Sequence, residues 1–174
     1  VIYLILTIIW MAAYWMAGMT GFDAVAHAMT TIATGGFSTS DASFAHFDSA
    51  MIDVIATLGM LVGALPFLLF LRTIQGDFGA LFSDTQVQWF LTTVLALILF
   101  TAGWLWLSNH VYPLKALQLA AFNIVSVITG TGFATDDYSQ WGSFANPLFF
   151  VIMFIGGCAG STTCGIKVFR FQIL

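Results

Sequence analysis

The sequence predicts an all-α integral membrane protein in which one helix–loop–helix arrangement occurs twice. The first observation is composition: of 174 residues, 60% are hydrophobic and only 7% are charged, with a mean hydropathy of +0.97. A soluble domain has about 25% charged and about 45–50% apolar residues. The second observation is that long uncharged runs recur along the chain, and the third is that glycine-rich stretches interrupt them. Lipid is therefore expected to cover much of the surface.

Charge and cysteine content exclude several classes of protein. The four Lys and Arg residues are scattered, so they cannot form the basic face that nucleic acid requires. The three histidines and two cysteines show no metal-ligand spacing. We expect no cofactor, no resident metal and no nucleic-acid partner. The chain begins in an apolar run without Met or a basic leader, which predicts a fragment and no signal peptide.

Four uncharged runs are candidates to cross a membrane, which takes about 20 apolar residues as a helix. They are residues 1–18, 54–71, 87–108 and 144–166. The second half of the fourth run is rich in Gly, Ser and Thr, which predicts that its helix is broken midway.

Two shorter segments lie between these runs. Residues 22–32 are moderately apolar, and Asp23 is placed to cap their start. Residues 112–128 begin near Pro113, which suits a first helical turn. Apolar helices of this length are typical of re-entrant segments in so hydrophobic a chain. Each is followed by a stretch rich in Gly and Thr, residues 34–37 and 129–133.

The order of elements repeats, and the repeat is visible in the residues themselves. Aligning Gly36-Phe37 with Gly132-Phe133 brings further identical residues into register. These are Ile32 with Ile128, Thr39 with Thr135, Asp41 with Asp137, and Ser43 with Ser139. The sequence therefore predicts two tandem helix–pore-loop–helix repeats with re-entrant pore helices.

The repeats are expected over residues 1–72 and 87–174, joined by a polar cytoplasmic linker over 73–86. Cytoplasmic flanks carry an excess of Lys and Arg. That rule places Arg72, Lys167 and Arg170 inside, with Lys115 as the exception. The acidic residues after the loops then face outward: Asp41, Asp48, Asp136 and Asp137.

The glycine-rich loops suit a cation pathway. Backbone carbonyls replace the water shell of a dehydrated potassium ion. Glycine allows that close approach because it has no Cβ and reaches positive φ. Irregular backbone at membrane depth is tolerated only where protein or a watery cavity covers it. The candidate filter residues are Ala33, Thr34, Gly35, Gly36, Thr129, Gly130, Thr131 and Gly132.

The broken part of the fourth run is a candidate gate. An unwound stretch below the filter can act as a movable barrier, so deleting residues 160–164 is expected to raise ion flux. The candidate gating residues are Gly156, Gly157, Gly160, Ser161, Thr162, Thr163 and Gly165.

At three motifs, residues 33–39, 129–135 and 156–167, the chain resembles the Trk/Ktr/HKT family of potassium transporters. It is most similar to the bacterial TrkH-like subunits. The resemblance implies a multi-pass protein of the bacterial inner membrane, with four repeats around one pore. This chain would supply the second and third repeats, with Gly36 and Gly132 as filter glycines. Cys164 departs from the pattern, since glycine is more typical there.

The resemblance also implies partners. Such subunits conduct K⁺ (and Rb⁺), require the remaining repeats, pair as homodimers and bind a cytosolic nucleotide-sensing ring. Within transport, a sodium-conducting or sodium-coupled relative is the alternative. An intramembrane hydrolase using Ser161 or Cys164 is a remote one, because no partnered base is visible and an enzyme is not expected. A non-conducting structural fragment is the third.

Overall fold

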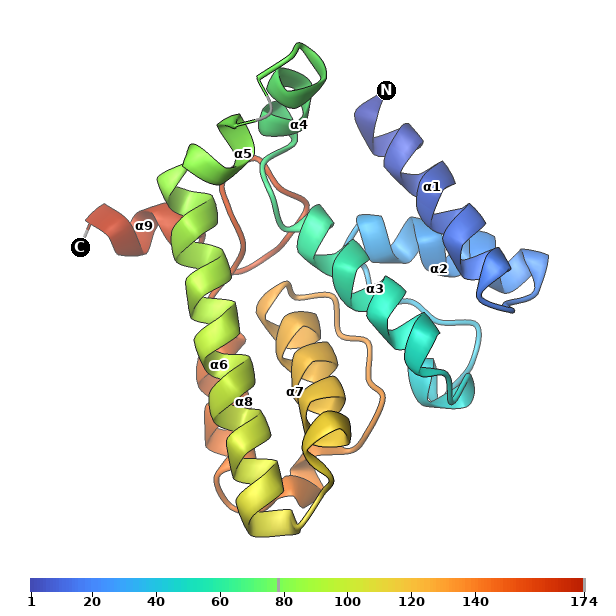
Figure 1. Ribbon diagram of the computed structural model, residues 1–174, viewed down its shortest axis with the longest axis vertical. Helices are drawn as coiled ribbons and strands as arrows, with labels where there is room; N and C mark the ends of the chain where they lie inside the picture. The colour runs from blue at the N-terminus through green and yellow to red at the C-terminus, as the bar shows by residue number, and fades with distance from the viewer. Residues whose placement is uncertain (78, 174) are drawn as a thin grey trace.

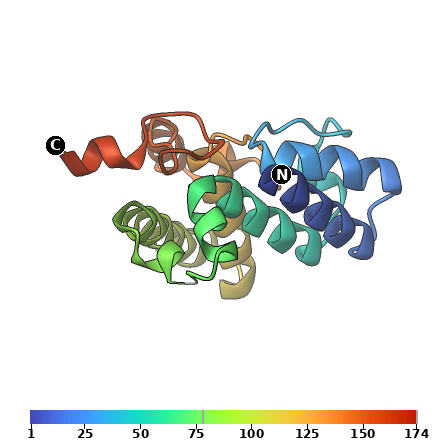
Figure 2. The ribbon, with the colours of Figure 1, turned by 90° about the horizontal axis from the view of Figure 1, so that it is seen from above.

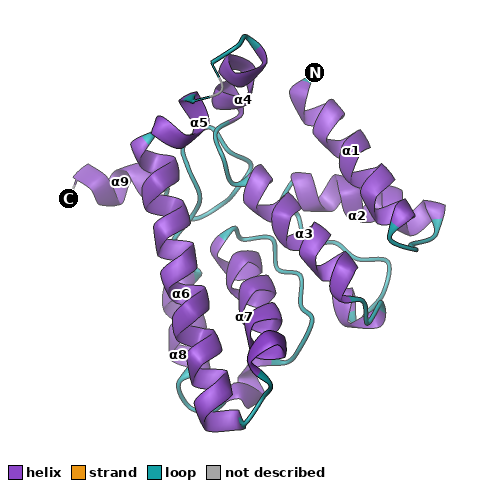
Figure 3. Ribbon diagram, viewed as in Figure 1, coloured by secondary structure: helices purple, strands orange, loops and turns teal. Residues whose placement is uncertain are grey.

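The chain is helical throughout its regular structure. Figure 1 shows the computed structural model, which describes residues 1–77 and 79–173. Within these two ranges the regular elements are helices and no β-strand forms; a single isolated bridge joins Ile155 to Ile166. Helices and loops alternate along the described chain (Figure 3). The predicted all-α class is confirmed.

The elements follow one another in the order that the sequence suggests. They are α1 (Ile2–Met16), α2 (Gly21–Ile32), the 3₁₀ turn η1 (Ser43–His46), α3 (Ala50–Gly63), α4 (Phe67–Ile74), α5 (Ala80–Ser83), α6 (Thr85–Asn109), α7 (Pro113–Ile128), the 3₁₀ turn η2 (Tyr138–Trp141), α8 (Ala145–Ile152) and α9 (Val168–Ile173).

Among residues 1–77 and 79–173, one helix, α6, is long and apolar enough to cross a membrane, with 25 residues and a mean hydropathy of 2.0 over its most apolar stretch. A second candidate is the pair α3 and α4, if the two count as one span, although the chain bends by 93° between them. Helices α1 and α7 are apolar but shorter. The expected run at residues 87–108 therefore coincides with α6.

The expectation of one continuous helix over residues 54–71 is wrong, and Pro66 gives the reason. Proline has no N–H to donate and disfavours helical backbone at the residue before it. Helix α3 accordingly ends at Gly63, and α4 begins at Phe67 with Pro66 as its N-cap. The helix crosses the expected unit boundary at residue 72, because α4 continues to Ile74.

The observed start of one helix agrees with the residue predicted for it, and the N-cap of another differs from the prediction. Pro113 occupies the first turn of α7, as predicted. Helix α2, however, is capped by Thr20 and not by Asp23. The Thr20 hydroxyl accepts a hydrogen bond from the Asp23 amide at 3.2 Å and donates one to its carboxylate at 2.6 Å. Thr20 has the extended backbone of an N-cap, whereas Asp23 already lies inside the first turn.

Two helical groups lie side by side (Figure 2). Helices α1, α2 and α3 pack on one another in the first group. In the second group, α6 and α8 both pack on α7. Contact between α3 and α7 joins the groups. The chain after α8 then turns back toward α4 and α5 (Figure 1).

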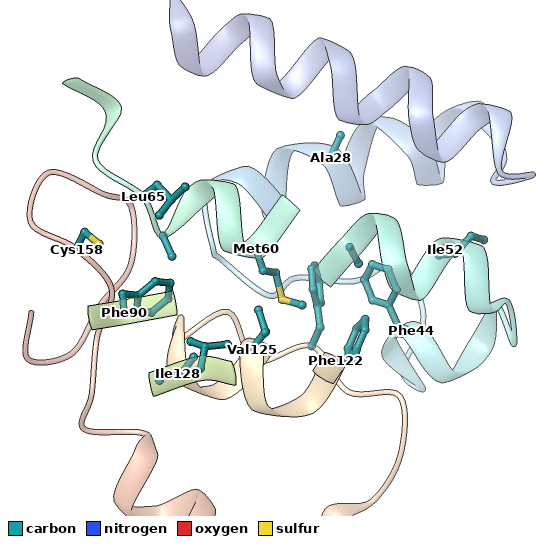
Figure 4. Packing of buried hydrophobic residues seen from close by; sticks show 14 of the residues in the cluster. Ala28, Phe44, Ile52, Met60, Leu65, Phe90, Phe122, Val125, Ile128 and Cys158 are labelled. Carbon is teal, nitrogen blue, oxygen red and sulfur yellow. The ribbon is translucent and has the colours of Figure 1, made fainter. Parts of the chain in front are cut away.

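A cluster of aromatic rings fills the junction between the groups (Figure 4). The Phe44 ring centroid lies 4.4 Å from that of Phe133 and 5.3 Å from that of Phe122. The His27 ring meets Phe44 edge-on at 5.2 Å. All four side chains are buried. Full burial of a phenylalanine contributes about 1.5–3 kcal/mol, so this cluster fixes how the two loop regions lie relative to each other.

Candidate functional site

The loop after α2 is tied back onto its own helix. The Gly35 amide donates to the Thr30 carbonyl at 2.8 Å. The Thr30 hydroxyl reaches forward to the Phe37 carbonyl at 2.9 Å. Between these ties the backbone is left-handed at Thr34 (φ 49°) and Gly36 (φ 71°). A β-branched residue at positive φ costs about 1–3 kcal/mol, so the surrounding contacts hold Thr34 in place.

The loop after α7 has the same construction. The Gly132 amide donates to the Ser126 carbonyl at 3.2 Å, and the Ser126 hydroxyl donates to the Phe133 carbonyl at 2.6 Å. The left-handed residues are Gly130 (φ 69°) and Gly132 (φ 86°). In the alignment that pairs Gly36 with Gly132, Thr30 falls on Ser126 and Thr34 on Gly130. The two loops therefore share the positions of their left-handed residues and one side-chain brace. The amide that bonds back to the helix differs, because Gly35 and Gly132 are not aligned with each other.

Side chains deeper in the two helices brace the outer part of each loop. The His27 Nε2 lies 3.0 Å from the Ser38 hydroxyl, so His27 braces the first loop. At the aligned position in α7, the Asn123 Nδ2 donates to the Thr135 hydroxyl at 2.9 Å. Both side chains are buried. A buried polar group is retained where it is hydrogen-bonded, so these contacts fix the loops from behind.

The two loops touch each other. A Cβ atom added at Gly36 would lie only 1.8 Å from the Thr131 carbonyl oxygen. Beyond this contact, the Ala45 amide donates to the Ala134 carbonyl at 3.2 Å, and the Ala134 amide donates to the Ser43 hydroxyl at 3.2 Å. The predicted filter residues of both halves are therefore brought together, with Gly36 at the contact.

The surroundings of the loops differ. Phe37 is 77% exposed, whereas its counterpart Phe133 is 2% exposed. A Cβ at Gly132 would meet no atom within 4 Å. Gly130 and Gly132 open onto a cavity of about 280 Å³ that η2 and α8 also line. The second loop thus faces open space on one side.

The predicted gating stretch lies in the segment between α8 and α9, residues 153–167, which is named the intramembrane loop below for the position that the sequence predicts for it. It packs against the break between α3 and α4. The Cys158 amide donates to the Ala64 carbonyl at 3.0 Å, and the Phe67 amide donates to the Gly160 carbonyl at 3.1 Å. Figure 4 shows Cys158 on this loop near Leu65. Sequence reasoning did not foresee that the two breaks meet.

Hydroxyl groups and Lys167 hold the intramembrane loop together from within. The Thr163 hydroxyl accepts from the Gly157 amide at 2.9 Å and lies 2.9 Å from the Ser161 hydroxyl. The Lys167 ammonium donates to the Thr163 carbonyl, to the Thr163 hydroxyl at 3.0 Å and to the Ser161 hydroxyl at 3.4 Å. A cation surrounded by these oxygens fixes the fold of the loop.

The intramembrane loop also reaches both filter regions. The Cys164 thiol lies 3.8 Å from the Gly130 carbonyl oxygen. Thr162 contacts the end of α2 and Thr34. Gly156 is closely packed, because an added Cβ would lie 2.2 Å from the Cys164 carbonyl oxygen. Cys164, which stands where the family more typically has glycine, therefore places a thiol directly beside the second loop.

Acidic residues follow the second loop. The Asp137 carboxylate accepts hydrogen bonds from the side chains of Ser139 and Gln140. These bonds, that of Ser139 most strongly, lower the pKa of Asp137 below its ordinary value. Asp136 accepts a hydrogen bond from the Trp141 indole at 2.8 Å. An ionised carboxylate beside a pathway raises the local concentration of cations.

The remaining features lie away from the loops. A cavity of about 430 Å³ between α3 and α7 is lined by apolar residues with Asp53 and Gln118. Among residues 1–77 and 79–173, no group of three or more His, Cys, Asp or Glu side chains could hold a metal ion.

Several braces were missed by sequence reasoning. Thr30 and Ser126 are hydroxyl residues at aligned positions, and that correspondence was a usable signal. Asn123 aligns with His27 but differs from it in type, so no identity marks the pair. The bond from Lys167 back into the intramembrane loop was also missed, because its positive charge suggested only a cytoplasmic flank.

The chain is similar to proteins of one family along its whole length. The sequence model of the TrkH family, described as a cation transport protein, matches residues 1–174. The Trk system potassium uptake protein TrkI of Halomonas elongata is 46% identical over 173 residues, which is 99% of this chain and 35% of that protein. The Trk system potassium uptake protein TrkH of Escherichia coli K12 is 38% identical over 175 residues, 99% of this chain and 36% of that protein.

A solved structure agrees with these relatives. The crystal structure of the potassium transporter TrkH from Vibrio parahaemolyticus matches with a TM-score of 0.94 at 38% identity. The match covers 99% of this chain and 38% of that chain. The chain therefore spans about a third of the length of the relatives it matches. These relatives are named as transport proteins and not as enzymes.

Proposed function

Because this chain belongs to the TrkH family of cation transport proteins, we propose that it carries part of a potassium-uptake pathway. Members of this family are membrane proteins. The observation that supports the pathway most directly is the contact between the two glycine-containing loops, with Gly36 against the Thr131 carbonyl. Lipid cannot satisfy the backbone groups of irregular loops, so such loops are tolerated only where protein buries them or where they line a water-filled cavity. Two of them in contact in so apolar a chain therefore favour a pathway.

The filter is proposed to consist of backbone carbonyls from both loops. Its residues are Ala33, Thr34, Gly35 and Gly36 in the first loop, and Thr129, Gly130, Thr131 and Gly132 in the second. The shared left-handed backbone at aligned positions supports this assignment. So do the matching braces from Thr30 and Ser126, which hold both loops in one shape. A repeated, fixed shape is what a ring of carbonyls requires.

The intramembrane loop is proposed to gate this pathway. The proposed gating residues are Gly156, Gly157, Gly160, Ser161, Thr162, Thr163 and Gly165. Thr162 contacts the first proposed filter loop, and Cys164, which lies among them in sequence, contacts the second. The Cys164 thiol beside the Gly130 carbonyl supports a barrier directly next to the second loop. Hydrogen bonds that tie Gly157, Ser161 and Lys167 to Thr163 hold the loop to itself, which supports its movement as a unit.

The two halves, residues 1–72 and 87–174, are proposed to be two repeats of a four-repeat pore, with the linker at residues 73–86 on the cytoplasmic side. Matching loop geometry supports the repeat. The short helix α5 and the Asp84 cap of α6, with the carboxylate 2.9 Å from the Gln86 amide, order residues 80–86 of the linker.

Localisation and assembly follow the family resemblance. We place the protein in the bacterial inner membrane as a multi-pass transporter with lipid around it. A homodimer and a cytosolic nucleotide-binding ring are proposed as partners on the resemblance alone. The positive charges Arg72, Lys167 and Arg170 support a cytoplasmic position for the ends of both halves.

Tracer uptake tests the proposal. The complete parent transporter is reconstituted in proteoliposomes, and uptake of radioactive rubidium is measured with unlabelled potassium or sodium as competitor. Potassium uptake predicts that potassium competes and sodium does not. Equal competition by both ions would favour the sodium-conducting alternative, and absence of any rubidium uptake would contradict the pathway. A Ser161→Ala, Cys164→Ala double variant that keeps uptake disposes of the hydrolase.

A further inference from the structure

Thr162 joins the ends of two helices that are far apart in sequence. Its hydroxyl lies 3.0 Å from the Ile32 carbonyl and 2.9 Å from the Gly63 carbonyl, and its amide donates to Gly63 at 3.1 Å. Ile32 is the last residue of α2, and Gly63 is the last residue of α3. Carbonyls at a helix C-terminus have no partner in their own helix and carry partial negative charge. Thr162 satisfies one of them in each helix.

Thr162 also touches the first filter loop directly. The Thr34 hydroxyl lies 3.3 Å from the Thr162 hydroxyl. Thr34 is buried and has the strained left-handed backbone of the first loop. A strained residue keeps its conformation only while its neighbours hold it. Thr162 is one of those neighbours.

The contact is closely packed. A Cβ atom added at Gly63 would lie 2.9 Å from the Ile32 carbonyl oxygen, 3.1 Å from Thr34 Cγ2 and 3.2 Å from the Thr162 hydroxyl. Gly63 therefore has no room for a side chain at the point where α3, the first loop and Thr162 meet. Movement of the intramembrane loop must therefore withdraw Thr162 or move the first loop with it.

Neighbouring hydroxyls in the loop act differently. The Ser161 hydroxyl bonds to the Cys158 carbonyl, and the Thr163 hydroxyl accepts from the Gly157 amide. Both bonds stay inside the intramembrane loop. The Thr162 hydroxyl, in contrast, spans 130 residues of sequence to reach Ile32.

We propose that Thr162 is a positioning residue that couples the gate to the filter. It fastens the intramembrane loop to the first filter loop, so that release of the gate loosens the carbonyls around Ile32 and Thr34. Gate opening and cation selectivity are then one linked event. The inference rests on the proposed function and adds to it a residue that sets selectivity without lining the filter.

The test uses Thr162→Val, which keeps the shape and removes the hydroxyl, and Thr162→Ser, which keeps the hydroxyl. Uptake of rubidium and of sodium is measured with the complete parent transporter in proteoliposomes. Loss of a hydrogen bond of this kind predicts about a fivefold rise in rubidium uptake for Thr162→Val. The rubidium-to-sodium ratio is expected to fall by about threefold or more. Thr162→Ser should retain both values.

Thr57→Val is the matched control, because the Thr57 hydroxyl bonds to Asp53 within its own helix at 2.8 Å. If Thr162→Val shows the same rubidium uptake and the same rubidium-to-sodium ratio as Thr57→Val, the coupling is overturned. Wild-type protein without any rubidium preference contradicts the proposed function instead, so the two failures are distinguishable. A raised uptake with an unchanged ratio also overturns the coupling, because it shows a gate independent of the filter.

A crosslink provides the second measurement in case Thr162→Val does not fold. Thr34→Cys with Thr162→Cys is prepared in a Cys158→Ala, Cys164→Ala background, and the bond is verified by mass spectrometry. Coupling predicts that oxidation lowers rubidium uptake by about tenfold and that a reductant restores it, since the gate is then fixed to the loop. Full uptake by the crosslinked protein overturns the inference.

Discussion

The two halves of the chain continue differently after their loops. In the first half, α3 and α4 are separated only by a bend of 93° at Pro66. In the second half, α8 ends at Ile152 and the irregular intramembrane loop extends to Lys167 before α9 begins. The same position in the proposed repeat is a sharp corner in one half and a long unwound stretch in the other.

The difference shows how a broken apolar helix is stabilised. Each break leaves backbone groups without partners, and such groups are costly where water is excluded. Here each break satisfies the other, through the bond from Cys158 to Ala64 and the bond from Phe67 to Gly160. The intramembrane loop therefore packs against the bend between α3 and α4.

A second contrast concerns the two proposed filter glycines. Gly36 and Gly132 have the same left-handed backbone. An added Cβ at Gly36 collides with the Thr131 carbonyl, whereas one at Gly132 meets open space. The two glycines thus have the same backbone conformation but different space for a side chain. Substitutions at the two positions can separate the effect of backbone strain from that of steric collision.

The largest effect is expected from Gly36→Ala. The methyl group forces the two loops apart, and the backbone at φ 71° adds strain of about 1–3 kcal/mol. Rubidium uptake in proteoliposomes should fall by about tenfold or more. Gly132→Ala, the matched control, carries only the backbone strain and should lose less. Equal losses in the two variants would show that the contact with Thr131 is not a constraint.

The second effect concerns the intramembrane loop. Gly156→Ala places a methyl group 2.2 Å from the Cys164 carbonyl oxygen, so the loop must shift. If this loop is the barrier, rubidium uptake rises by about fivefold, a barrier change of about 1 kcal/mol. Gly103→Ala in α6 is the control, because its backbone is not left-handed and its methyl group meets nothing within 4 Å. A fall in uptake for folded Gly156→Ala protein would contradict the gating role.

A smaller effect is expected from Lys167→Met. The substitution keeps the length of the side chain but removes the ammonium that bonds to Ser161 and Thr163. The loop loosens, and uptake should rise about threefold, since one bond to a charged group is worth about 1.5–3 kcal/mol and partial exposure weakens it. Lys167→Arg should lie between Met and wild type. Uptake equal to wild type in Lys167→Met would show that this contact is incidental.

The smallest effect tests the equivalence of the halves. Thr30→Val and Ser126→Ala each remove the hydroxyl that bonds to the carbonyl of the following phenylalanine. Each loss should cost about 1 kcal/mol of stability. The two variants should lower the rubidium-to-sodium ratio by the same factor as each other. Thermal unfolding and dual-tracer uptake measure the two quantities. Strongly unequal changes in the ratio would mean that one loop alone sets selectivity.

Much of the fold follows from local chemistry. The apolar run at residues 87–108 and the proline at 113 predict α6 and the start of α7, because both depend on hydrophobicity and backbone restriction within a few residues. The corner at Pro66 carried a signal as well, which the uncharged run around it obscured. The Thr20 cap was missed because Thr and Asp are both good caps three residues apart.

The candidate site was predictable only in part. Glycines at aligned positions indicated two loops of one kind, and the shared φ values agree. The contact between Gly36 and Thr131, and the reach of Thr162 to Ile32, join residues more than ninety positions apart. Such pairings depend on how α3 and α7 pack, and no local pattern contains that information.

The most direct test of the account is the rubidium-to-sodium uptake ratio of Gly132→Ser in the complete parent transporter. Gly132 has free space for the side chain, so the protein can fold while a hydroxyl enters the proposed filter. If carbonyls of both loops select the ion, rubidium uptake persists and the ratio falls by about threefold or more. An unchanged ratio with normal uptake would mean that the second loop is structural and the ion passes elsewhere.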